Sequence, residues 1–130
     1  MAGTFFVFAC AVMPALARGD DRTYVEVMRN INDVIQNPLF LVPFLAALPL
    51  TALAAWRRRD RLLWAATAAY ALTFLITVVG NIPLNDGLAA STDPAAARER
   101  FEEAWVLWNA ARAVTSTAAL GLLGWRRRGC

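Results

Sequence analysis

Three long apolar runs dominate the pattern of hydrophobic and polar positions along the chain, at residues 38–56, 62–80 and 104–125. Each run is close to the roughly 20 residues with which a helix crosses the hydrocarbon core of a bilayer. The first two runs contain only Thr and Tyr as polar side chains, whereas the third contains Asn109 and Arg112. If these runs were buried helices of a soluble protein, too little polar sequence would remain to cover their core. The pattern therefore predicts membrane-spanning helices.

A shorter apolar run, residues 2–17, precedes them. At a rise of ~1.5 Å per residue, a helix of this length reaches only about 24 Å. The segment PALARG at its end is similar to a signal-peptide cleavage site, but no Lys or Arg precedes the apolar stretch, as it does in such peptides. We expect a retained but short first span. A start codon assigned downstream of the true one would also explain the shortness.

The basic residues are all Arg, and seven of the 13 gather in two clusters that flank the apolar runs. These clusters are Arg57, Arg58, Arg59 and Arg61 after the first long run, and Arg126, Arg127 and Arg128 after the third. Positively charged flanks stay in the cytoplasm, and both clusters lie on one side only if the number of spans is even. The net charge of +3 is therefore interpreted as an indicator of membrane topology. The expected partners of the arginines are membrane lipid head groups, and no nucleic acid is expected.

These observations predict one transmembrane domain over residues 1–130, with spans at 2–17, 38–56, 62–80 and 104–125. The expected fold is all-α: an antiparallel four-helix transmembrane bundle with an amphipathic outer helix and an extended fourth helix. Both termini are expected in the cytoplasm, and the membrane is expected to be the cell's inner or plasma membrane. A homo-oligomer is left open.

The first outer connection, residues 20–36, has apolar side chains at helical spacing. They are Tyr24, Val27, Met28, Ile31, Val34 and Ile35. The pattern predicts an amphipathic helix that begins at Asp20 or Asp21 and ends near Pro38. We expect it to lie flat on the outer surface, either as a simple connector or as a lid over the mouth of the bundle.

The second outer connection begins with the segment NIPLNDG at residues 81–87. Pro83 and Gly87 within it are typical of a loop. Asp93 then caps a helix whose first residue is Pro94. Nothing in the sequence breaks this helix before Trp125, so the fourth helix is expected to extend well beyond the bilayer.

Composition limits the chemistry. Hydrophobic residues make up 58% and charged residues 18% of the chain, against roughly 45–50% and 25% in soluble domains, which disfavours an ordinary soluble enzyme. The chain has no His, and its two Cys, Cys10 and Cys130, lie at opposite ends. This removes the commonest metal ligands and the commonest general base, so no metal is expected. Cys10 is interpreted as a small core hydrophobe and Cys130 as part of a frayed tail.

The third long run contains the most informative group of side chains. Trp105, Trp108, Asn109 and Arg112 share one helix face. A charge at the depth of Arg112 is costly in lipid, and such residues usually face the bundle interior or a wet cavity. The alternative is that Arg112 reaches outward to the head groups, and that the two tryptophans belong to an interfacial belt.

Other polar side chains are expected at the same outer level. They are the amides Asn32, Asn37, Asn81 and Asn85 and the carboxylate Asp86. Each Asn taken singly is explained by helix capping or turn formation, and Asp86 by a solvated loop. Six amide and guanidinium groups at one level of a small bundle favour a polar site instead.

Four segments in this order are similar to one known family. FFVFACAVMPAL, MRNINDVIQNPLF, NIPLND and FEEAWVLWNAAR resemble the anthrone oxygenase-like family of small four-span membrane proteins, also called domain of unknown function 1772. The resemblance covers nearly the whole chain, and only the first span is shorter than the family pattern. It implies cofactor-independent oxidation by O₂ of anthrones, which are lipophilic aromatic intermediates of polyketide pathways, by a monooxygenase.

The resemblance suggests roles for the polar cluster. Trp105 and Trp108 would wall a slot for a flat ring. Arg112 and Asn109 would hold the developing oxyanion, supported by Asn81 or Asn85, with Asn32 and Asn37 as further substrate contacts. Asp86 is the candidate base and bound water the second choice. The alternative is a non-catalytic small membrane protein that binds a lipophilic molecule or stabilises a partner complex.

Overall fold

The computed structural model describes residues 1–126, which are almost entirely helical and contain no strand within that range. The elements are α1 (Ala2–Val7), η1 (Phe8–Val12), α2 (Met13–Leu16), α3 (Asp21–Val34), α4 (Pro38–Arg58), α5 (Arg61–Ile76), η2 (Thr77–Asn81), α6 (Ile82–Ala90) and α7 (Pro94–Arg126), where η denotes a π-helical turn. The predicted features at Arg127, Arg128 and Cys130 lie outside the described residues.

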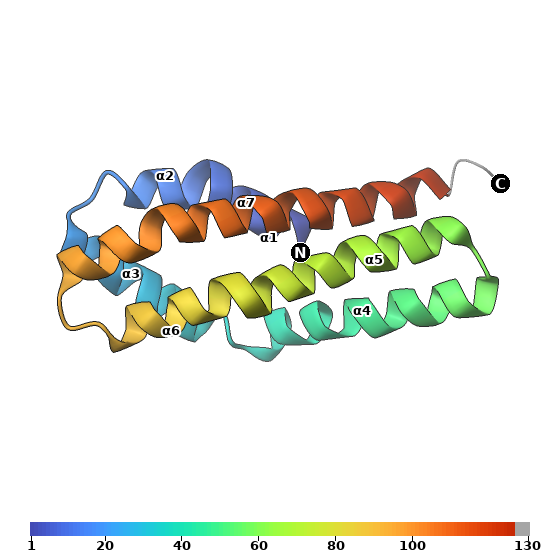
Figure 1. The fold of residues 1–130 in the computed structure, drawn as a ribbon, viewed down its shortest axis with the longest axis horizontal. Coiled ribbons are helices and arrows are strands. Elements are labelled where there is room, and N and C mark those ends of the chain that lie inside the picture. The colour runs from blue at the N-terminus through green and yellow to red at the C-terminus, as the bar shows by residue number, and fades with distance from the viewer. Residues whose placement is uncertain (127–130) are drawn as a thin grey trace.

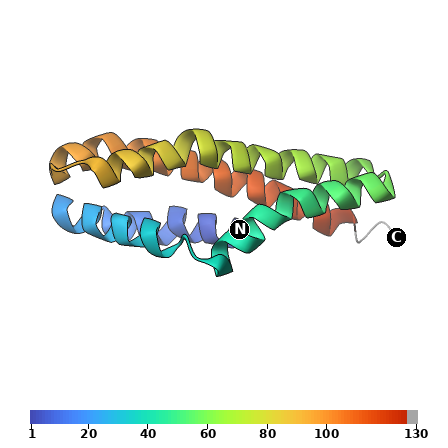
Figure 2. The ribbon, with the colours of Figure 1, turned by 90° about the horizontal axis from the view of Figure 1, so that it is seen from below.

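The segments run along one long axis (Figure 1). α1, η1 and α2 follow one another without a break, and so do α5, η2 and α6. The α5–η2–α6 helix and α7 lie side by side along the length of the molecule and pack closely. α4 packs on α5 at one half of this pair, while α1–α2 and α3 occupy the other half (Figure 2).

The predicted loop at residues 81–87 is wrong, because these residues continue the helix to Ala90. Pro83 lies in the first turn of α6, where its missing N–H does least harm. The π turn η2 directly precedes it and changes the hydrogen-bond register. No glycine among the described residues has a positive φ, so Gly87 adopts an ordinary helical conformation. The chain reverses instead between Ala90 and Pro94.

The predicted starts of the two outer helices hold. Asp20 caps α3 by accepting hydrogen bonds from the Thr23 backbone N–H at 3.0 Å and from the Thr23 hydroxyl at 2.7 Å. Asp93 accepts from the N–H of Ala95 at 3.0 Å, and the helix that follows reaches Arg126 without interruption, as its unbroken pattern predicts.

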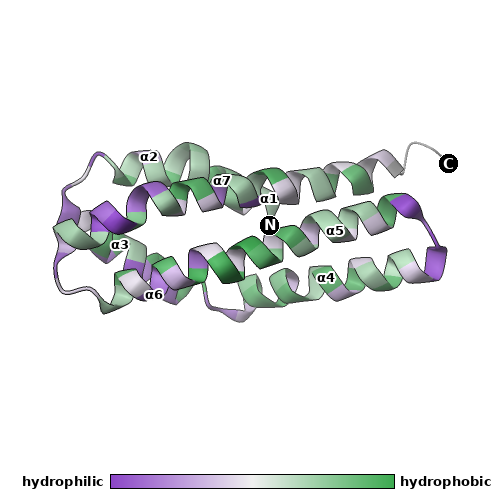
Figure 3. Cartoon of the chain, in the orientation of Figure 1, coloured by the Kyte–Doolittle hydropathy of each residue, from purple (hydrophilic) through white to green (hydrophobic). Residues whose placement is uncertain are grey.

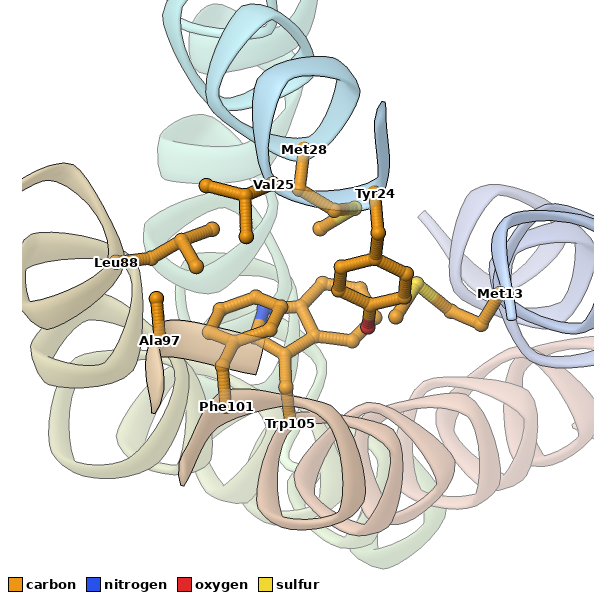
Figure 4. Close-up of a cluster of buried hydrophobic side chains, with 8 residues drawn as sticks. All are labelled: Met13, Tyr24, Val25, Met28, Leu88, Ala97, Phe101 and Trp105. Carbon is orange, nitrogen blue, oxygen red and sulfur yellow. The ribbon is translucent and has the colours of Figure 1, made fainter. Parts of the chain in front are cut away.

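The amphipathic helix predicted at residues 20–36 is present as α3, whereas its position flat on a membrane surface stays a prediction. α3 runs along the long axis (Figure 2), and its apolar face packs on α6 and α7. The buried cluster comprises Met13, Tyr24, Val25, Met28, Leu88, Ala97, Phe101 and Trp105 (Figure 4). The physical reason is that α6 and α7 extend outward together and present apolar side chains, which the apolar face of α3 covers.

Two arginines attach α3 to its neighbours. Arg98 of α7 donates to the carboxylates of Asp21 at 3.0 Å and Glu102 at 2.7 Å, and to two carbonyls of the turn before α3. Its guanidinium carbon lies 4.7 Å from the ring centroid of Tyr24. Arg29 of α3 donates to the carbonyls of Leu88 and Ser91 at the end of α6. The end of the molecule that carries α3 is therefore a packed subdomain.

Within residues 1–126, two helices are long and apolar enough to cross a membrane: α4, and the continuous helix Arg61–Ala90. Only 11% of the most apolar window of α4 is buried, so its hydrophobic side chains face outward, which a helix in a soluble core would not do. The helix Ala2–Leu16 is apolar but shorter. α7, the predicted fourth span, is not among the candidates, since Asn109 and Arg112 lower its hydropathy. Polar residues gather at the two ends of the molecule (Figure 3).

Gly80 in η2 allows α7 to approach closely. A Cβ atom at this position would overlap the indole of Trp108, at 2.7 Å from Cγ and 2.9 Å from Cε2. We expect Gly80→Ala to lower the free energy of unfolding by about 1–3 kcal/mol, the usual cost of overpacking. The measurement is thermal unfolding in a mild detergent followed by circular dichroism.

Gly87→Ala is the matched control, because a Cβ there meets nothing within 4 Å. It should leave stability unchanged or raise it by about 0.5–1 kcal/mol. Equal effects of the two variants would contradict the close packing of Trp108 on η2.

Tyr24 is fully buried, and its hydroxyl has no hydrogen-bond partner among the described residues. Burial raises the pKa of its phenol above the usual value of about 10, and the charge of Glu102 acts in the same direction. The folded state therefore keeps the phenol neutral while the unfolded chain ionises, so this stabilisation is complete below about pH 10 and is lost as the pH rises further. We expect the Tyr24→Phe variant to lose less stability than the wild type as the pH rises. Unfolding experiments from neutral to alkaline pH measure this difference.

At neutral pH the same variant should be as stable as the wild type, because no hydrogen bond is lost. Tyr70→Phe is the comparison. The Tyr70 hydroxyl of the wild type donates to the Phe44 carbonyl at 3.0 Å. Loss of this hydrogen bond should lower the free energy of unfolding by about 1 kcal/mol. A Tyr24→Phe variant that is less stable than Tyr70→Phe would contradict this assignment.

Candidate functional site

A cavity of about 280 Å³ lies where the first helix, the junction between α3 and α4, the η2–α6 segment and α7 meet. The chain leaves α3 at Val34 and begins α4 at Pro38, and this break leaves space that no side chain fills. The aromatic side chains on its walls are Phe5, Phe8, Phe40, Phe44 and Trp105, and the polar ones include Asn32, Asn85, Asp86, Asn109 and Arg112. Its volume is close to the lower limit of the roughly 300–1,000 Å³ usual for small-molecule sites.

Arg112 and Asn109 form the polar end of the cavity. Arg112 Nη2 donates to Asn109 Oδ1 at 2.9 Å, and Asn109 Nδ2 donates to the Phe5 carbonyl at 3.0 Å. Arg112 is 7% exposed and Asn109 1%. The alternative in which Arg112 reaches outward to head groups therefore does not hold in this structure. The amide holds the guanidinium in place against the first helix.

The guanidinium lies between two aromatic rings. Its central carbon is 4.4 Å from the ring centroid of Phe5 and 5.4 Å from that of Trp105. Contacts of this kind stabilise a cation by about 0.5–2 kcal/mol. None of the three ion pairs found among the described residues includes Arg112, and its Nε has no hydrogen-bond partner there. The end of the cavity is thus strongly electropositive.

Trp105 forms one wall and is held by α6. Its Nε1 donates to Asn85 Oδ1 at 2.9 Å, and its ring packs on Phe8 and Phe101, with centroids 5.7 and 5.9 Å away. Asn85 can reach this ring because η2 and α6 continue the helix of α5 past the predicted loop. The polar level expected from the sequence is therefore built partly from helix α6.

Asp86 and Asn32 also line the cavity. Asp86 lies on α6 with an exposed side chain, and its carboxylate has no hydrogen-bond or ion-pair partner among the described residues. Asn32 comes from the last turns of α3. Both residues therefore sit at the cavity rim, where solvent reaches them.

Three of the predicted site residues do not line the cavity. Trp108 packs on Gly80 and is 38% exposed, so it does not share a slot with Trp105. Asn37 caps α4, accepting from the Phe40 N–H at 3.2 Å and donating to the Val34 carbonyl at 2.7 Å. Asn81 in η2 is 1% exposed, and neither of its amide atoms has a hydrogen-bond partner among the described residues.

Sequence reasoning missed the aromatic walls, which Phe5, Phe8, Phe40 and Phe44 supply together with the apolar end of α3. Their signal is weak, because a phenylalanine facing lipid and one facing a cavity have the same spacing in an apolar run. Phe40 and Phe44, at i and i+4, stack with ring centroids 5.7 Å apart. The feature that distinguishes them from lipid-facing phenylalanines is that they line the same cavity as Arg112.

The Asn109 amide should be a stability determinant of the site. Asn109→Ala leaves Arg112 Nη2 without its partner and removes the side-chain hydrogen bond to the Phe5 carbonyl, which keeps its backbone partner at Phe8, and we expect it to lower the free energy of unfolding by about 1–3 kcal/mol. Thermal unfolding in detergent measures this difference. Asn30→Ala, at an exposed position of α3, is the control and should change stability by no more than about 0.5 kcal/mol. An Asn109→Ala variant with wild-type stability would mean that the bridge from Arg112 to Phe5 contributes nothing.

Comparison with known proteins gives one match. Residues 26–122 match the family described as Anthrone oxygenase, which is most of the chain and includes every cavity residue on α4, α6 and α7. No curated protein and no solved structure matches the chain.

Proposed function

This chain belongs to the anthrone oxygenase family, and we propose that it oxidises an anthrone-like or phenolic polyketide ring with O₂, without a bound cofactor, in the cavity beside Arg112. The observation that carries the proposal is a buried guanidinium, free of carboxylate partners among the described residues, at the end of a cavity walled by aromatic rings. The substrate is a lipophilic aromatic molecule, which reaches the cavity from the membrane.

The chemistry needs little from the protein. An anthrone has an acidic CH₂ group opposite its carbonyl, and loss of one proton gives a delocalised anion with much of its charge on oxygen. A C–O bond then forms between the CH₂ carbon and O₂, and protonation gives a hydroperoxide. Loss of the second proton from that carbon breaks the O–O bond and releases water. One O₂ is consumed, and one quinone carbonyl and one water are formed.

Each role falls to a side chain of the cavity. Phe5 and Trp105 hold the flat ring, and Arg112 stabilises the oxyanion as it develops, which is the most effective kind of catalysis for such a step. Asn109 positions Arg112. Asp86 at the rim accepts the proton from the CH₂ group, with bound water as the second candidate. Asn85 keeps the Trp105 ring in place.

We also propose that the family fold crosses the membrane four times, with α1–α2, α4, α5–α6 and α7 as an antiparallel bundle and both termini in the cytoplasm. Charge distribution supports this orientation. The turn between α4 and α5 carries Arg57, Arg58, Arg59 and Arg61 with Asp60 as its one carboxylate, whereas at the opposite end the carboxylates Asp20, Asp21 and Asp93 offset Arg18 and Arg22. Arginine-rich turns remain on the cytoplasmic side, so the cavity would open toward the outer side.

A non-catalytic function is the second candidate. The exposed position of Asp86 favours it, because a solvated carboxylate is a weak base for carbon acids. In that case the cavity binds a lipophilic aromatic molecule without converting it. The two candidates differ in one observable, which is consumption of O₂.

The test is O₂ uptake by purified protein given emodin anthrone, with EDTA present throughout and heat-denatured protein as the baseline for spontaneous oxidation. We expect uptake well above this baseline. Arg112→Ala and the neutral, similarly long Arg112→Gln should reduce the rate by about 100-fold or more, the usual effect of removing an oxyanion donor. Size-exclusion chromatography checks that both variants remain folded.

Arg100→Ala is the matched control, since Arg100 lies on the same helix with an exposed side chain. It should retain the wild-type rate. Uptake by folded Arg112→Gln equal to that of the wild type would overturn the oxyanion assignment. Absence of uptake by the wild type, combined with binding of an anthraquinone, would favour the non-catalytic candidate.

A further inference from the structure

We infer that the cavity selects its ring ligand as an organic anion: a flat hydroxyaromatic molecule whose oxygen is already ionised when it binds. This inference rests on the proposed function, because it names the substrate class of the same site. It goes further in stating that the charge is present in the bound ground state. Binding should then depend on pH through the acidity of the ligand.

The arginines of this chain differ in what surrounds them. Arg98, near the surface, has two carboxylates and two backbone carbonyls as partners. Arg29 has two backbone carbonyls. Arg112, which is 7% exposed, has a single neutral amide oxygen, and its Nε has no hydrogen-bond partner among the described residues. The most enclosed of these three cations is therefore the least compensated.

An enclosed and uncompensated charge is costly. Removing a cation from water is unfavourable unless an anion or a full set of hydrogen bonds replaces the water. Two ring contacts offset only part of this cost. An anionic oxygen that enters the cavity supplies the missing partner, and hydrogen bonds between ions are roughly twice as strong as neutral ones. A neutral ligand would leave most of this cost in place.

The other charged and titratable groups near the site do not supply that partner. Asp86 lies at the rim, exposed and without an ion pair among the described residues. The Tyr70 hydroxyl on α5 donates to the Phe44 carbonyl, and Arg29 on α3 donates to carbonyls at the end of α6. Cys10 on η1 is exposed. Within the described cavity, Arg112 is thus the cation that an anion meets.

The walls decide which anion fits. Phe5 and Trp105 flank the guanidinium, and Phe8, Phe40 and Phe44 continue the aromatic lining. Aromatic walls favour flat rings, which stack on them at centroid distances of about 4.5–7 Å. A fatty-acid carboxylate has the same charge but a flexible chain, and it would gain less from these walls. An ionised phenol on a fused ring matches both features.

The experiment compares two ligands that differ only in whether they can ionise. 2-Hydroxyanthraquinone and its methyl ether, 2-methoxyanthraquinone, are titrated into the full chain in a neutral detergent, from acidic to mildly alkaline pH. Quenching of tryptophan fluorescence reports binding. We expect the affinity for the hydroxy compound to rise about tenfold or more as its phenol ionises, equivalent to about 1.4 kcal/mol, while that for the methyl ether stays constant.

Two variants assign the pH dependence. In Arg112→Gln the rise with pH should disappear, while the methyl ether binds within about twofold of wild type, a change of about 0.4 kcal/mol that also shows an intact cavity. In Asp86→Asn the rise should persist, because the ionising group is on the ligand. The comparison of the two ligands on the wild type stands even if Arg112→Gln does not fold.

The inference is overturned if the methyl ether binds as tightly as the hydroxy compound at every pH, or if folded Arg112→Gln keeps the rise. Tighter competition by dodecanoate than by the hydroxy compound would assign the site to lipid carboxylates and overturn the aromatic part. Binding by neither ring compound would overturn it entirely. O₂ uptake without pH-dependent selection would leave the proposed function standing, whereas selection without uptake would reject only the oxidation.

Discussion

The enclosure of one guanidinium organises this molecule. Arg112 is held by Asn109, which in turn bonds to the backbone of the first helix at Phe5. This chain of two hydrogen bonds attaches the N-terminal helix to α7 at the level where the cavity opens. Arg98 makes a second polar connection between α7 and the end of the first helix, at the Ala17 carbonyl. The Arg112 guanidinium, which lines the cavity, therefore also connects two of the helices that enclose it.

The two ends of the structure are stabilised by different physics. At the outer end, α3 covers an apolar face of α6 and α7 and is fastened by Arg98 and Arg29 to carboxylates and carbonyls, as in a water-soluble helical protein. At the other end, α4 keeps its apolar side chains exposed. The cavity lies between these regimes, open to groups from both. An aromatic ligand that partitions into lipid can therefore contact polar groups of the protein once it enters the cavity.

Much of the helical pattern was predictable, because it depends on local chemistry. The apolar runs, the caps at Asp20 and Asp93 and the pairing of Asn109 with Arg112 follow from short-range spacing. The helical conformation of Pro83 and Gly87 could not be predicted in this way, because a π turn and packing on α7 override signals that usually mark a loop. Trp105 and Trp108, three residues apart, differ by about 60° around the helix, enough for one to face the cavity and the other Gly80. No local rule decides which of them does so.

The π turn η2 has an evolutionary consequence. Thr73 and Asn85 both form hydrogen bonds to α7, Thr73 to Thr115 and Asn85 to Trp105. The segment from Thr73 to Asn85 contains more residues than the segment of α7 from Trp105 to Thr115. The surplus is taken up partly in the wider turn, since an extra residue in an ordinary helix would turn everything beyond it by about 100°. Insertions and deletions at this point can thus re-aim α6 while α5 keeps its phase. A change in the length of this one segment would therefore alter the cavity, since Ile82, Asn85 and Asp86 of α6 line it.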